Sequence, residues 1–172
     1  LYSARDLIGN AEKYAENHEA VLKALAEMGY SGVEAANYGD GKFYGVSPEQ
    51  FKADVEAAGM EVVSSHTNRK LTAEEFASGD LTEALAWWDA AIPAHVAAGM
   101  RYVVIPSMTM PETLKDLKLT CDYFNEVGRR CNAAGMDFGF HNHSREFKKV
   151  EDVVIMDYML ENTDPELVFF QM

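Results

Sequence analysis

Residues 133–147, AAGMDFGFHNHSREF, carry the two signals that decide the fold and indicate a site. The first half reads as the end of a helix, a glycine and a short apolar strand, and that strand runs directly into His141, His143 and Glu146. Ionisable side chains are rarely buried without a partner, so this position indicates metal binding or proton transfer. The alternative is that the histidines are hydrogen-bonded at a strand end and that Glu146 is solvated.

The helix–glycine–strand pattern occurs three more times along the chain. Its copies are AAGM at 57–60 before EVVSSH, AAGM at 97–100 before RYVVIPS, and the looser AEMGY at 26–30 before SGVEAANY. Glycine is favoured just after a helix because it adopts left-handed backbone angles. The glycines at 29, 59, 99 and 135 give a period of 30 to 40 residues, which is the length of one βα unit.

Helix starts agree with this period. Ser47-Pro48-Glu49-Gln50 combines an N-cap with a proline at the first helical position, and Thr72-Ala73-Glu74-Glu75 is a capping box. We expect strands near residues 1–3, 32–37, 61–66, 102–106, 137–142 and 167–171. We expect helices near residues 14–28, 48–58, 81–98, 112–134 and 150–161.

Alternating βα units predict an α/β fold with a parallel sheet covered by helices. No glycine-rich phosphate loop follows a strand, as an open dinucleotide-binding sheet would require. Instead, polar residues recur at the carboxyl ends of strands, which is typical of a TIM (β/α)8-type barrel: Glu34, Asn37, His66 and Ser107. Because a whole barrel needs about 250 residues, we expect residues 1–172 to be a single barrel domain, incomplete after about six strands and truncated at the C-terminus.

Composition excludes several classes of function. The net charge of -13 argues against a nucleic-acid partner, which needs clustered basic residues. No apolar run is long enough to cross a membrane. Cys121 and Cys131 lie ten residues apart in one expected helix, too far for a disulfide, so we expect a buried reduced pair. The expected location is cytoplasmic, or periplasmic if a leader was removed.

Four stretches, LYSARD at 1–6, GVEAANY at 32–38, SSH at 64–66 and FHNHSREF at 140–147, resemble the xylose isomerase-like barrels. These are the sugar phosphate isomerase/epimerase family, which is related in fold to endonuclease IV. The resemblance implies a divalent cation (Mn, Zn, Mg or Co) at the carboxyl end of the barrel and a small-molecule carbohydrate substrate. It leaves homo-oligomerisation open.

By position in the motif, the resemblance makes Glu146 a metal ligand and a catalytic residue, and His141 the neighbouring catalytic imidazole. In the alternative, His141 or His143 binds the metal and Glu146 supports it. The remaining ligands are expected beyond Met172.

Four further residues are expected to bind substrate: Glu34, His66, His143 and Tyr2. For Glu34 the alternative is a buried ion pair, for example with Arg5. For His66 it is a bond to backbone.

The implied reaction is isomerisation or epimerisation of a sugar or sugar phosphate. A cation on the carbonyl and hydroxyl oxygens stabilises an enediolate, and a positioned side chain removes the proton next to the carbonyl. The alternatives are a related lyase or hydratase on keto-sugars, a non-catalytic carbohydrate-binding barrel and, less favoured, an endonuclease IV-like nuclease. His18 and His95 fall on expected helices, where we predict that they are solvated.

Overall fold

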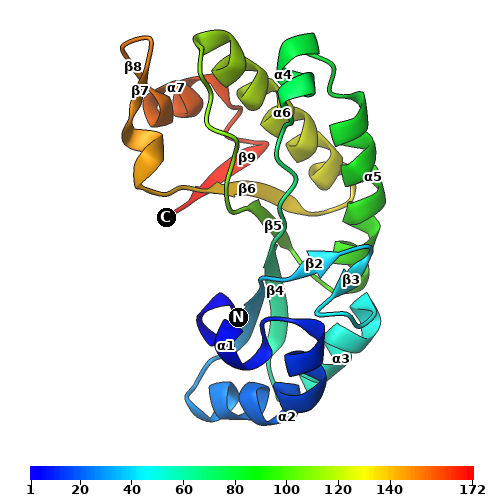
Figure 1. The fold of residues 1–172 in the computed structure, drawn as a ribbon. Helices are drawn as coiled ribbons and strands as arrows, with labels where there is room; N and C mark the ends of the chain where they lie inside the picture. The colour runs from blue at the N-terminus through cyan, green and yellow to red at the C-terminus, as the bar shows by residue number, and fades with distance from the viewer. The chain divides into compact units, whose positions relative to one another are not determined.

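A computed structural model describes all residues from 1 to 172. Its α-helices are α1 (Arg5–Ile8), α2 (Ala11–Glu27), α3 (Pro48–Ala57), α4 (Ala73–Ser78), α5 (Thr82–Ala97), α6 (Leu114–Ala133) and α7 (Ile155–Asn162). Its strands are β1 (Gly32–Ala35), β2 (Tyr38–Gly39), β3 (Lys42–Phe43), β4 (Glu61–His66), β5 (Tyr102–Ile105), β6 (Asp137–His141), β7 (Lys149–Val150), β8 (Val153–Val154) and β9 (Val168–Gln171). Two 3-10 helices cover Tyr2–Ala4 and Ser144–Phe147. Figure 1 follows this order by colour.

The chain divides into two compact units, and the division falls within α5 and β5. The first unit contains residues 1–67 and 90–103, and the second contains 68–89 and 104–172. In the first unit the strand order is β1-β4-β5, with β1 parallel to β4. In the second unit the order is β5-β6-β9, with β6 parallel to β9. Parallel strands in chain order, with helices between successive strands, confirm the α/β TIM-barrel fold class.

The glycine repeat is confirmed at all four positions. The φ angles are 96° at Gly29, 82° at Gly59, 78° at Gly99 and 79° at Gly135, each just after the end of a helix. Side chains with a Cβ rarely adopt these angles, so glycine allows the chain to leave the helix and enter the next strand.

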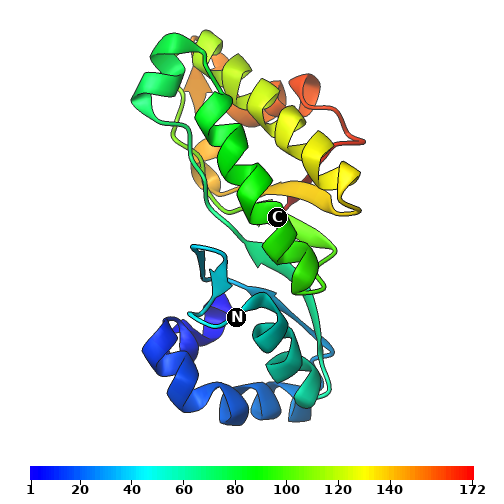
Figure 2. The same cartoon turned by 90° about the vertical axis from the view of Figure 1, so that its right-hand side faces the viewer.

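Helices cover the strands of each unit. In the first unit α2 and α3 lie side by side (Figure 2), and Tyr14, Phe43 and Phe51 are fully or almost fully buried there. In the second unit α6 lies along β6 (Figure 1), and the Phe124 and Phe140 rings pack with their centroids 5.3 Å apart. Apolar side chains therefore build a core in each unit.

The cysteine prediction is confirmed. Cys121 and Cys131 both lie on α6, buried and unbonded to one another. Burial raises the pKa of each thiol to about 12, because the charged thiolate loses its hydration in the core. No helix combines the length and the hydropathy that crossing a membrane requires.

Two predicted elements are wrong. Residues 1–3, expected as a strand, belong to a 3-10 turn in which the Ala4 N–H donates to the Leu1 carbonyl at 3.0 Å. Among the first seven residues none is buried, whereas a barrel strand must be.

The helix expected over 150–161 begins only at Ile155, because β7 and β8 form a hairpin first. The turn of this hairpin is formed by Glu151 and Asp152, with φ of 46° and 66°. Neither residue is the glycine that would have indicated such a turn in the sequence.

Candidate functional site

In the first unit, Glu34 and His66 meet at the carboxyl ends of neighbouring parallel strands. The His66 Nε2 atom lies 3.0 Å from Glu34 Oε1, with the side chains 17% and 28% exposed respectively. The register between β1 and β4 shifts between Val33 and Glu34, so that Glu34 stands beside Ser64. A bulge of this kind redirects a side chain, and such bulges are common next to active sites.

This contact determines which ring nitrogen of His66 carries a hydrogen. An ionised carboxylate accepts hydrogen bonds and does not donate them, so Nε2 carries a proton toward Glu34. A carboxylate that orients an imidazole in this way also favours its protonated form. The pair can therefore hold a proton, or orient a hydroxyl or carbonyl group of a bound molecule.

Ser64 adds a polar atom to this strand end that sequence reasoning missed. It is 5% exposed, and its Oγ is buried without a hydrogen-bond partner. Side chains two residues apart on a strand share a face, so Ser64 lies on the same face as His66. The only signal in the sequence was its place in the SSH motif at 64–66.

Tyr2, predicted to bind substrate, lies on the 3-10 turn with 62% of its surface exposed. The guanidinium carbon of Arg5 lies 4.5 Å from the centre of the Tyr2 ring, a cation–π contact. Arg5 also donates to the Tyr2 carbonyl at 3.1 Å. The substrate-binding role of Tyr2 remains a prediction.

In the second unit, His141 is the last residue of β6, and His143 lies two residues beyond it. Their ring centres lie 4.8 Å apart at 84°, an edge-to-face contact. Between them, the Asn142 N–H donates to the Gln171 carbonyl of β9 at 3.2 Å, while Asn142 Oδ1 is buried without a partner. That oxygen was not predicted as a site atom, and it is a ready acceptor for a hydroxyl group.

Glu146 lies on the 3-10 helix after β6, and its side chain is wholly buried. Its Oε2 accepts the His143 N–H at 2.7 Å, and its Oε1 lies 3.3 Å from Arg145 Nε. In this structure the carboxylate therefore caps a turn and forms an ion pair. Its roles as catalytic residue and metal ligand remain predictions.

The donor set for a cation is incomplete within residues 1–172. No three side chains of His, Cys, Asp or Glu gather in an arrangement that could hold a metal ion. Hard divalent cations take several oxygen ligands, and Zn²⁺ takes three or four protein ligands. Glu146 and its neighbours do not fit such a site by themselves.

Helical histidines depart from the prediction that they are solvated. His18 on α2 is partly buried, stacked on Tyr14 with ring centres 4.8 Å apart. It lines a groove of about 430 Å³ formed by α2 and α3, whereas barrel enzymes build their sites at strand ends. His95 on α5 is fully buried. The residues around it, 90–99, contain no other ionisable side chain, which could have indicated burial.

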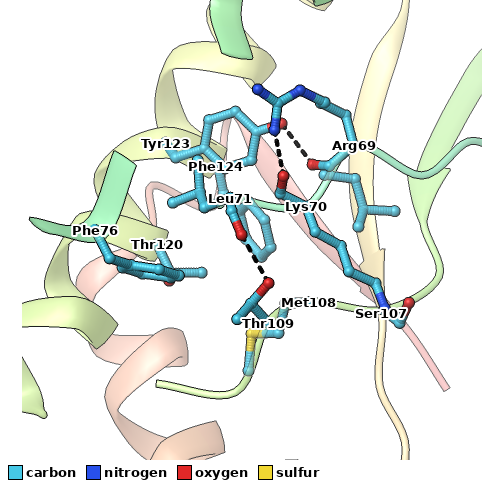
Figure 3. A pocket seen from close by; sticks show the side chains of 11 residues that line it. Arg69, Lys70, Leu71, Phe76, Ser107, Met108, Thr109, Thr120, Tyr123 and Phe124 are labelled. Atoms are coloured by element: carbon cyan, nitrogen blue, oxygen red, sulfur yellow. Dashed lines mark hydrogen bonds between the residues drawn. The ribbon is translucent and has the colours of Figure 1, made fainter. Parts of the chain in front are cut away.

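A small cavity lies beside the segment that follows β4, lined by residues of α4, α6 and the loop after β5 (Figure 3). Its volume of about 10 Å³ accommodates roughly one water molecule and no sugar. The Tyr123 hydroxyl donates to the Arg69 carbonyl at 2.8 Å, and the Thr109 hydroxyl donates to the Leu71 carbonyl at 2.7 Å. Within the second unit, these bonds hold the segment against α6 and the loop after β5.

Comparisons with known proteins agree with the TIM-barrel fold class. Two solved structures described as sugar phosphate isomerase/epimerases from Parabacteroides distasonis are 28% and 32% identical to the chain, each with a TM-score of 0.83. They cover 97% and 94% of this chain, which spans 62% and 64% of theirs. A D-psicose 3-epimerase with D-tagatose from Clostridium cellulolyticum H10 is 16% identical with a TM-score of 0.61, over 90% of this chain and 57% of its own, and shares the fold.

No curated protein matches the chain. Residues 22–171 match the family model described as xylose isomerase-like TIM barrel. This match covers most of the 172 residues. The chain therefore belongs to the xylose isomerase-like TIM-barrel family.

Proposed function

We propose that the protein is a sugar isomerase or epimerase that moves a proton next to a carbonyl group. The observation that carries this proposal is the same in both units. Ionisable side chains lie at the carboxyl ends of parallel strands, Glu34 with His66 in the first unit and His141 with His143 in the second. Similarity to the two Parabacteroides distasonis proteins supports it.

The proposed chemistry starts with His141. An imidazole titrates near neutrality, so it can accept the proton from the carbon next to the carbonyl and later return it. The electron pair of the broken C–H bond moves into an enediolate. Return of the proton to the neighbouring carbon, with transfer of the hydroxyl proton between the two oxygens, isomerises the sugar. Epimerisation instead requires a proton to reach the opposite face of the same carbon, and a second acid on that face, a side chain or solvent, supplies it.

The other residues would bind and orient substrate. A Glu34 carboxylate oxygen can accept from a sugar hydroxyl, and the doubly protonated His66 ring, which donates Nε2–H to Glu34, can donate Nδ1–H to a hydroxyl or carbonyl oxygen of the sugar. In the second unit, the partnerless Asn142 Oδ1 can accept from a sugar hydroxyl. A bound polar substrate would thereby satisfy an atom that is otherwise buried at a cost.

The family resemblance adds a divalent cation (Mn, Zn, Mg or Co) that would polarise the carbonyl when bound. Since no three candidate ligands gather in residues 1–172, no step proposed here depends on that cation. Glu146 is the residue that we assign to it from the motif. This assignment requires the carboxylate to exchange its contacts with His143 and Arg145.

Exchange of substrate hydrogen with solvent tests the proposal. The purified protein is incubated in D2O with ketopentoses and ketohexoses, free and phosphorylated, and deuterium at the carbon next to the carbonyl is followed by proton NMR. We expect exchange with at least one sugar, its loss in His141→Asn, and its retention in His18→Asn, a matched change on α2. Absence of exchange with every sugar, or full exchange by His141→Asn, would contradict the proposal.

A further inference from the structure

A chain of buried polar side chains runs beneath the end of β4 in the first unit. The Ser65 and Thr67 hydroxyl oxygens lie 2.9 Å apart, and the Thr67 hydroxyl oxygen lies 2.7 Å from His95 Nε2. At the other side of the ring, His95 Nδ1 lies 2.9 Å from the Ala91 carbonyl oxygen. Ser65, Thr67 and His95 are 0%, 1% and 0% exposed, so water does not compete for these bonds.

The donor and the acceptor of each of these hydrogen bonds follow from the Ala91 carbonyl oxygen, which is the last acceptor. A carbonyl oxygen only accepts, so His95 Nδ1 must carry a hydrogen. Burial lowers the pKa of His95 to about 4, which keeps the ring neutral and leaves Nε2 as an acceptor. Thr67 therefore donates to His95, and Ser65 donates to Thr67. The direction of each hydrogen bond is thereby fixed. The Tyr38 and Phe43 rings also pack against His95, with ring centres 4.6 and 5.0 Å from that of His95.

This buried chain flanks His66 on both sides. Successive residues of an extended chain point to opposite faces, so Ser65 and Thr67 face α5 while His66 faces Glu34. A shift of the β4 end would break two buried hydrogen bonds, each costly to leave unmade. A neighbouring anchor holds the end of β1, where the Ala36 N–H donates to the buried Tyr44 hydroxyl at 2.8 Å.

We infer that His95 is a positioning residue which, through Thr67 and Ser65, fixes the end of β4 so that His66 points at Glu34. The functional meaning of that orientation rests on the proposed isomerase or epimerase activity. The orientation itself does not, and it can be measured without a substrate. The Thr67 hydroxyl joins Ser65 to His95 by accepting from one and donating to the other, whereas a plain apolar core would need no hydroxyl or imidazole at these three positions.

Histidine ring NMR provides the test, because the protein has five histidines that single substitutions can assign. Thr67→Val keeps the shape of the side chain but removes the hydroxyl, and Thr67→Ser restores it. We expect the His66 ring signals of folded Thr67→Val to move toward those of Glu34→Gln, which lacks the charged partner. In Thr67→Ser they should return to their wild-type positions, and His95 should show the Nδ1–H tautomer in the wild type.

Ser65→Ala is a milder variant that removes only the hydrogen bond from Ser65 to Thr67. It tests the positioning role if Thr67→Val does not fold. A smaller displacement of the His66 signals would support the inference. Wild-type His66 signals in a folded Thr67→Val or Ser65→Ala protein would overturn it, as would the Nε2–H tautomer of His95.

Activity provides the second readout. We expect kcat/KM to fall about 10- to 100-fold in Thr67→Val, since misplacing a binding group by about 1 Å has effects of that size, and to recover in Thr67→Ser. If the wild type exchanges no substrate hydrogen, the proposed function fails while the NMR result still decides the positioning role. If the wild type is active and Thr67→Val is as active, the positioning role fails alone.

Discussion

The two strand ends that carry ionisable residues are built differently. In the first unit, Glu34 and His66 contact each other, remain partly exposed, and are held from below by buried side chains of other elements. In the second unit, Glu146 is wholly buried and bonded to the backbone and side chain of its own turn. The same residue types can therefore form an accessible polar pair in one place and a structural cap in another. Burial and partners distinguish them, and residue identity does not.

The largest expected effect separates chemistry from binding. His141→Asn should lower kcat about 10²- to 10⁴-fold with little change in KM, because it removes a group that transfers a proton. His66→Asn should instead raise KM with a smaller loss of kcat, because it removes a binding contact. Steady-state kinetics on the sugar identified by the exchange assay measure both. The reverse pattern would move the proton transfer to the first unit.

Acid should destabilise the first unit through His95. Its pKa of about 4 in the folded protein lies below the ordinary 6.5, so the unfolded chain binds more protons between those values. Stability that is present above pH 6.5 should fall as the pH approaches 4, by about 3 kcal/mol. Urea unfolding at several pH values measures this loss. His95→Gln should flatten the profile, and an unchanged profile would show that other groups cause it.

Glu146→Ala should reduce the free energy of unfolding by about 1 to 3 kcal/mol, since the His143 N–H loses its buried acceptor. Glu146→Gln is the control, because its amide oxygen can still accept that hydrogen bond and the loss should be smaller. Urea unfolding and metal analysis are measured together. A variant of unchanged stability that loses bound metal would identify the carboxylate as a ligand and not a cap.

A double-mutant cycle on Glu34 and His66 should give a coupling energy of about 1 kcal/mol in substrate binding. The pair is partly exposed, which weakens the attraction between the two groups. KM of Glu34→Gln, His66→Asn and the double variant provides the cycle. Additive effects would show that the two residues act separately on the substrate.

The smallest effect is expected at Tyr2. Tyr2→Ala should raise KM about two- to fivefold if the ring contacts substrate, with no measurable loss of stability, because the side chain is mostly exposed. Arg5→Ala is the matched control, since it removes the cation over the ring and the hydrogen bond to the Tyr2 carbonyl but leaves the Tyr2 side chain present. An unchanged KM in Tyr2→Ala would remove this residue from the site.

The fold was predictable because its signals are local. A glycine with positive φ after each of α2, α3, α5 and α6 is read from a few neighbouring residues, and its spacing gives the βα period. The hairpin of β7 and β8 was missed because Glu151 and Asp152 adopt positive φ without the usual turn residues.

The candidate site was predictable in its residue types but not in its partners. The contact of Glu34 with His66 depends on a register shift, and the bond from Thr67 to His95 joins residues 28 positions apart. Neither relation leaves a periodic pattern in the sequence. The burial of Glu146 likewise follows from three-dimensional packing around a turn, which residue type alone does not indicate.

The placement of the two thiols means that a thiol reagent can report on one unit and not on the other. Both cysteines of the chain lie on α6 in the second unit, and their thiols are buried and protonated at neutral pH. A thiol-reactive dye can modify these thiols only when α6 detaches from the core and exposes them. The labelling rate therefore reports local unfolding of the second unit. The first unit contains no cysteine, so the dye does not label it. The natural chain thus carries a reporter of local unfolding in one of its two units, without any added label site.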